Sequence, residues 1–176
     1  MNDAKRKCIW KYLAIAVLPT LLLLNIPIRN VVVLSLGTAV LLETRPVDPR
    51  DLLRGDYVRL DYEISDIPKK FVTEELRELA DAERALYVHL ALDEKGVASV
   101  AGVSAQPPRG GIYLEARPQR RWGSSSLTCD YGLGVYYVPE GTGLELERAM
   151  REHAVFADVR VLRGRGVIRK LEIVRK

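Results

Sequence analysis

With 176 residues, 48% of them hydrophobic and 28% charged, the chain can hold one compact domain plus an accessory segment and is too apolar for general disorder. Its net charge of +4 is uneven, because residues 1–28 hold four basic residues and one acidic residue (+3), which leaves +1 for the rest. Since nucleic-acid-binding domains concentrate basic charge on their folded part, this near-neutral remainder argues against nucleic acid as a partner.

An apolar segment at residues 8–28 follows a basic tail at residues 1–7. Its only charge is Lys11. As a helix rising about 1.5 Å per residue, it would cover the roughly 30 Å hydrocarbon layer of a bilayer. Trp10 and Tyr12 stand where interfacial aromatic residues are favoured. The segment therefore predicts a transmembrane signal anchor, with the lipid bilayer as a partner.

A cleaved signal peptide is the alternative to an anchor. The basic tail suits both, but residues 25–29 (N-I-P-I-R) offer no small-x-small cleavage site, which favours the anchor. Because a basic flank stays on the cytoplasmic side, we expect a single-pass protein of the cytoplasmic (inner) membrane. Residues 1–7 would then form a cytoplasmic tail and residues 29–176 an extracytoplasmic β-rich domain.

A second apolar run covers residues 31–42 and is interrupted by Ser35, Gly37 and Thr38. It is too short to cross a bilayer, and its β-branched residues favour a buried strand over residues 31–43. A second membrane segment is the alternative, and it would return the domain to the cytoplasm.

Residues 57–64 alternate between apolar and polar side chains after a turn that ends at Gly55. The apolar positions are Val58, Leu60, Tyr62 and Ile64, and the others are Tyr57, Arg59, Asp61 and Glu63. A period of two with one apolar face predicts a half-buried strand.

Turns separate further short predicted elements. Strands are predicted at residues 86–92, 97–103, 111–117, 127–138, 154–162 and 167–174. Two short helices are predicted at residues 73–84, with Thr73 as N-cap, and at residues 142–150, opened by a capping box. Seven or eight strands with two short helices predict a mostly β (β-rich α+β) fold, in which a transmembrane helix precedes a mainly antiparallel sheet or partly closed barrel.

Two blocks of the sequence carry a family resemblance. Gly55-Asp56-Tyr57-Val58-Arg59-Leu60-Asp61-Tyr62 reads G-D-Y-x-x-L-x-Y without departure, and the chain resembles the GDYXXLXY family named after this signature. Residues 131–147 are similar to the family's downstream block, with Tyr137 where phenylalanine is usual. The resemblance implies a bacterial membrane-associated protein of unestablished activity. It also implies an association with polytopic membrane proteins.

The signature itself is mainly structural in this interpretation. Gly55 and Asp56 suit a turn, and Leu60 and Tyr62 share the apolar face. Tyr57 shares the polar face, where it is either ordinary strand packing or part of a ligand or partner surface. The candidate functional surface comprises Asp56, Tyr57, Arg59, Tyr131 and Glu140.

No metal site or cofactor is predicted, and no catalytic residue is assigned. His89 and His153 lack the spacing of metal ligands, and no phosphate- or dinucleotide-binding glycine motif is present. We expect His89 to be structural and Cys129 to be a small buried apolar residue.

Two sets of charged residues each have more than one interpretation. Asp56 and Glu140 could form an acid pair or bind a cation, or could simply cap turns. The basic residues Arg117, Arg120 and Arg121, together with those of residues 160–176, could contact phospholipid head groups or could be solvated surface.

The sequence as a whole favours a non-enzymatic accessory or interaction domain that docks on a membrane protein or envelope component. An envelope hydrolase that uses the carboxylates is one alternative. A domain that senses a small ligand through the face of Tyr57 and Arg59 is another.

Overall fold

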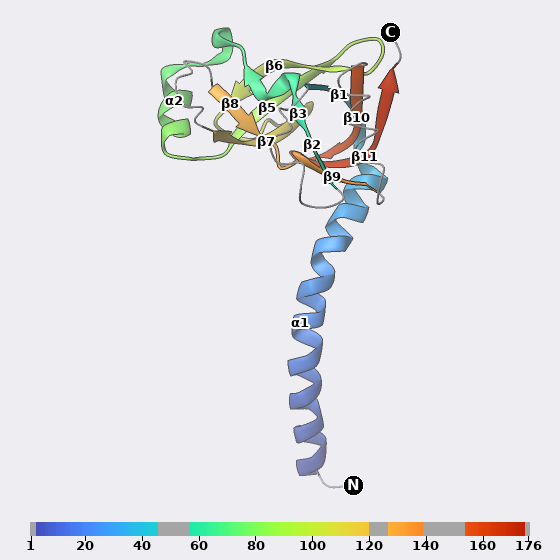
Figure 1. Cartoon of the computed structure of the whole chain (residues 1–176). Helices are drawn as coiled ribbons and strands as arrows, with labels where there is room; N and C mark the ends of the chain where they lie inside the picture. Colours follow the sequence, from blue (N-terminus) through green and yellow to red (C-terminus); the bar gives the residue numbers. More distant parts are fainter. Residues whose placement is uncertain (1–2, 46–56, 120–126, 139–153, 175–176) are drawn as a thin grey trace.

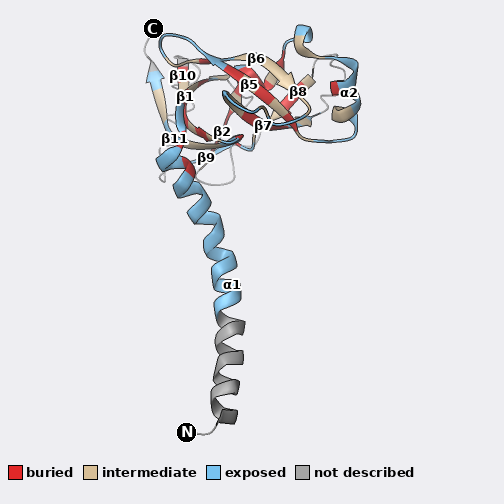
Figure 2. Ribbon diagram, turned by 180° about the vertical axis from the view of Figure 1, so that it is seen from behind, coloured by how far each residue is buried: buried red, intermediate tan, exposed pale blue. Residues whose placement is uncertain are grey.

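A single long helix carries a β-rich domain in the computed structural model of the chain (Figure 1). The structure describes residues 3–45, 57–119, 127–138 and 154–174. Helix α1 runs from Asp3 to Leu36 and contains Pro19 and Pro27. Its stretch Val17–Leu36 is long and apolar enough to cross a membrane, by length and composition. Figure 2 shows that residues 17–36 of this helix are largely exposed.

The predicted strand over residues 31–43 begins too early. Residues 31–36 continue α1, and the first strand, β1, spans Thr38–Arg45. Valine costs a helix only a few tenths of a kcal/mol relative to alanine, so a helix already established can pass through residues 31–33. Because α1 is continuous, these residues extend the first apolar helix and do not form a second membrane segment.

Gly37 joins α1 to the domain at a point of close approach. Its N–H donates to the carbonyl of Val33 at 2.8 Å. A Cβ at residue 37 would overlap that oxygen and would lie 3.1 Å from both Arg160 Cβ and Val161 N. The Arg160 guanidinium donates to the Gly37 carbonyl at 3.4 Å, at the helix end where a positive charge is favoured. The helix therefore meets the domain through a fixed joint.

The strands form antiparallel sheets of four, two and five strands, in the orders β11-β10-β1-β3, β2-β9 and β4-β8-β7-β5-β6. Their bounds after β1 are β2 Tyr57–Arg59, β3 Asp61–Tyr62, β4 Asp66–Ile67, β5 Leu86–Leu92, β6 Ala98–Ser104, β7 Ile112–Gln119, β8 Leu127–Asp130, β9 Val135–Tyr137, β10 Ala154–Leu162 and β11 Arg165–Val174. The short helices are α2 (Glu74–Asp81) and two 3₁₀ turns, η1 (Glu63–Ser65) and η2 (Lys69–Phe71). Within the described ranges the sheets do not close into a barrel.

Local signals located several elements correctly. The hairpin of β10 and β11 turns at Arg163 and Gly164, both with positive φ, which suits the twist of the strands. Helix α2 starts where predicted, and the Thr73 hydroxyl accepts from the Leu76 N–H at 3.4 Å. The predicted helix at residues 142–150 lies outside the described residues.

Two predicted strands are broken in the structure. The segment 57–64 is divided into β2, β3 and η1, although its alternation of buried and less buried residues holds. The segment 127–138 is divided into β8 and β9 by a turn in which Gly132 has a φ of +70°. The Asp130 carboxylate accepts from the Gly132 N–H at 2.8 Å and stabilises this turn.

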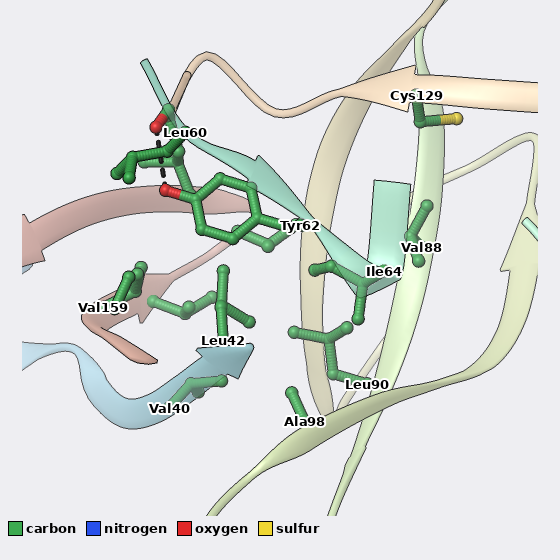
Figure 3. Close-up of a cluster of buried hydrophobic side chains, with 14 of the residues drawn as sticks. Val40, Leu42, Leu60, Tyr62, Ile64, Val88, Leu90, Ala98, Cys129 and Val159 are labelled. Atoms are coloured by element: carbon green, nitrogen blue, oxygen red, sulfur yellow. Dashed lines mark hydrogen bonds between the residues drawn. The ribbon is translucent and has the colours of Figure 1, made fainter. Parts of the chain in front are cut away.

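One hydrophobic cluster joins all three sheets (Figures 2 and 3). Leu42 of β1 and Leu114 of β7 are fully buried in it, and Cys129 is 2% exposed. Figure 3 shows Tyr62 and Ile64 beside Leu42 and near Val88 of β5. The end of the signature segment therefore packs between the two larger sheets.

Candidate functional site

The two family-like blocks pair with each other. Strand β2, from the G-D-Y-x-x-L-x-Y block, is antiparallel to β9, from the downstream block. In this register Tyr57 lies opposite Tyr137, and Arg59 lies opposite Val135. The Leu60 N–H adds a hydrogen bond to the Gly134 carbonyl at 3.0 Å. We call this pair of strands the β2–β9 ribbon.

The ribbon has a buried face and an outward face. Val58 and Tyr136, which lie opposite each other, pack on the core. Among the outward residues Tyr137 is 78% exposed and Val135 is 46% exposed. The rings of Tyr57 and Tyr137 meet edge to face, with centroids 6.3 Å apart and planes inclined by 61°. The outward face therefore consists of Tyr57, Arg59, Val135 and Tyr137.

The other tyrosines of the two blocks face the interior. The Tyr62 hydroxyl donates to the Leu133 carbonyl at 2.8 Å, and the Tyr131 hydroxyl donates to the Ile64 carbonyl at 2.6 Å. Burial is the main cause that raises the pKa of both phenols. Both phenols therefore stay protonated. One hydrogen bond runs from the signature segment to the turn between β8 and β9, and the other runs from that turn back to η1.

Arg45, at the end of β1, connects three segments. Its guanidinium pairs with Glu63 of η1 at 2.8 Å and also contacts the Asp66 carboxylate of β4. It donates to the Glu63 carbonyl at 3.0 Å, and Asp66 accepts from the Thr128 hydroxyl of β8 at 3.1 Å. The hydrogen bond with Glu63, and then the one with Asp66, raises the pKa of Arg45. This network ties the four-stranded sheet to the five-stranded sheet.

Cys129 is buried, as predicted, and His89 contacts the neighbouring strand. Burial raises the pKa of the Cys129 thiol to about 12, so the thiol is protonated and unreactive in the folded chain. His89 Nε2 is 2.9 Å from the Ser104 hydroxyl across the β5–β6 pair. Within the part of the chain that the structure describes, no group of three or more His, Cys, Asp or Glu side chains could hold a metal ion.

The five predicted surface residues have different placements. Tyr57 and Arg59 lie together on β2, whereas Tyr131 contacts η1. Asp56 and Glu140 lie outside the described residues, so their proximity remains a prediction. Chemically, two phenol rings beside a guanidinium and an isopropyl group suit binding to an amphipathic surface.

Sequence reasoning missed Val135, Tyr137 and Arg45. A usable signal existed for the first two, because they belong to the downstream block and flank an inward Tyr136. No local signal marked Arg45, since its partners come from separate segments.

Comparison with known sequences and structures places this chain in a family. No curated protein and no solved structure matches it. The sequence matches the GDYXXLXY protein family over residues 19–171, a range that contains α1 from Pro19 onward and all strands but the last residues of β11. With most of its length matched, the chain belongs to the GDYXXLXY protein family.

Proposed function

We propose that this protein is a membrane-anchored, extracytoplasmic accessory domain that docks on a membrane protein or envelope component. The observation that carries the proposal is the exposed apolar surface of α1. Leu18, Leu22 and Leu23 are each mostly exposed, and the stretch Val17–Leu36 meets the length needed to cross a bilayer. Such a surface is unfavourable in water and favourable in lipid.

The proposed orientation is supported by charge. The basic residues of the N-terminal tail favour the cytoplasmic side, which leaves the β-rich domain outside. The boundary of the anchor at residues 8–28 and the extracytoplasmic location remain predictions from the sequence.

The accessory role is supported by how the signature residues are used. Leu60 and Tyr62 belong to the core, and the Tyr62 and Tyr131 hydroxyls are engaged by backbone carbonyls. The part of the two blocks that stays outward is a small aromatic and cationic surface, which is suited to contact and not to bond cleavage.

Purification of the tagged full-length chain in mild detergent tests this function. We expect the detergent-corrected mass by light scattering to exceed the 19.8 kDa of the chain, with a second membrane or envelope protein in defined proportion. A lone monomer under gentle conditions would count against docking. A hydrolytic activity lost in Asp56→Ala and Glu140→Ala, with thermal unfolding unchanged, would replace the accessory role by an enzyme.

A further inference from the structure

We propose that the outward face of the β2–β9 ribbon lies in the head-group layer of the bilayer that α1 crosses. The domain would then rest against the membrane surface. This inference rests on the proposed anchor, and it adds a second, shallow membrane contact to it.

The length of α1 sets the level of its last turn. The stretch Val17–Leu36 rises about 30 Å as a helix, which equals the thickness of the hydrocarbon layer of a bilayer. Leu36, the last residue of the helix, then lies at the outer edge of the hydrocarbon layer, next to the head groups.

The ribbon lies at the same end of the domain as that last turn. Both views show β2 and β9 at the end from which α1 leaves (Figures 1 and 2). No spacer holds the domain away, because β1 begins two residues after Leu36 and Gly37 is held by Arg160. A fixed joint therefore brings the ribbon to the bilayer whenever α1 is inserted.

The side chains of the outward face match the chemistry of that layer. Tyrosine is enriched at membrane interfaces because its ring is apolar and its hydroxyl is polar, and Tyr137 is the most exposed large hydrophobic side chain among those described. Arg59 is exposed beside it on β2. Exposed Arg163 and Arg165 frame the turn after β10. This turn lies just beyond Val161, which pairs with Thr38, the first residue of β1 after α1. These guanidinium groups suit lipid phosphates.

Quenching of tryptophan by brominated lipid tests this contact. The full-length chain is reconstituted in vesicles of phosphatidylcholine and phosphatidylglycerol brominated near the start of the acyl chains. In a Trp10→Phe, Trp122→Phe background, Tyr137→Trp carries the only tryptophan. We expect a loss of its emission and a blue shift relative to unbrominated detergent micelles.

Two further variants make the outcome decisive. Ile173→Trp in the same background is the matched control, because Ile173 is exposed and belongs to the last residues of β11. That end of β11 lies away from α1 (Figure 1). A Trp122→Phe variant that keeps Trp10 reports on the anchor alone. Quenching in the Tyr137→Trp variant and of Trp10, but not in the Ile173→Trp variant, supports the proposal.

Other outcomes separate the two proposals. Quenching of Trp10 without quenching in the Tyr137→Trp variant would overturn the ribbon contact and leave the anchor intact. Equal quenching in the Tyr137→Trp and Ile173→Trp variants would also overturn it. An unquenched Trp10, with the chain absent from floated vesicles, would instead overturn the anchor.

Discussion

Leucine has opposite surroundings in the two parts of this molecule. Leu22 in α1 is 69% exposed, whereas Leu42 in β1 is 0% exposed. In the domain, three sheets enclose one hydrophobic cluster, and few of the described polar side chains are buried. In α1, apolar side chains face outward over many turns. The domain buries its apolar side chains, whereas the helix exposes apolar side chains, which is unfavourable in water.

This difference separates two sources of stability. The free energy of unfolding of the domain depends on its core and its buried hydrogen bonds. The contribution of α1 to the stability of the whole chain depends on the medium that surrounds this helix. Substitutions in the domain should therefore change its free energy of unfolding, whereas substitutions in α1 should leave it nearly unchanged. The following predictions test that separation.

The largest effect is expected for a core leucine. Leu42→Ala should lower the free energy of unfolding of the domain by about 2–5 kcal/mol, because it leaves a cavity among side chains that cannot fully close it. Leu22→Ala should change it by less than about 0.5 kcal/mol. Urea unfolding of the full chain in detergent micelles measures both, and equal losses would contradict the separation.

Loss of a buried hydroxyl comes next. Tyr62→Phe should lower the free energy of unfolding by about 1–3 kcal/mol, because the Leu133 carbonyl loses its side-chain donor. Tyr137→Phe is the matched control, since that ring is 78% exposed, and it should have almost no effect. A similar change in both variants would show that the Tyr62 hydrogen bond contributes little.

Alkaline pH should weaken the domain through Cys129. Its thiol pKa is raised from 9.0 to about 12 by burial, so the folded state favours the neutral form. This contribution is complete below pH 9 and is lost as the pH rises toward 12, by up to about 1.4 kcal/mol per pH unit. Urea midpoints between pH 8 and pH 10 measure the slope. Cys129→Ala should flatten it, and an unchanged slope would assign the loss to other groups.

The smallest effect is expected at the edge of the core. Arg45→Ala should lower the free energy of unfolding by about 1 kcal/mol, because it removes two partly exposed ion pairs and the hydrogen bond to the Glu63 carbonyl. Arg77→Ala removes a more exposed pair with Glu74 and should cost less than about 0.5 kcal/mol. A larger loss for Arg77→Ala would contradict the role of the Arg45 network.

Local signals in the sequence were sufficient for elements that local chemistry determines. The turn at Arg163 and Gly164, the N-cap Thr73 and the buried face of residues 58–64 all follow from short-range patterns. The end of α1 was misjudged because valine-rich helix and strand look alike over a few residues.

The candidate site depends on contacts that no short pattern contains. The β2–β9 pairing joins segments far apart in the chain, and so does the hydrogen bond between Tyr131 and Ile64. The same holds for the network of Arg45, Glu63 and Asp66. Such contacts are decided by packing of the whole domain, so the sequence indicated the outward Tyr57 and Arg59 but not their neighbours Val135 and Tyr137.

Labelling of single cysteines in spheroplasts tests the central claim that α1 crosses the membrane and leaves the domain outside. Glu94→Cys in a Cys8→Ser background places a thiol on the exposed β5–β6 turn, while Cys129 is buried. A membrane-impermeant maleimide should label the Glu94→Cys variant in intact spheroplasts and should label Cys8 of the native chain only after permeabilisation. Labelling of Cys8 in intact spheroplasts, with the Glu94→Cys variant protected, would contradict the account.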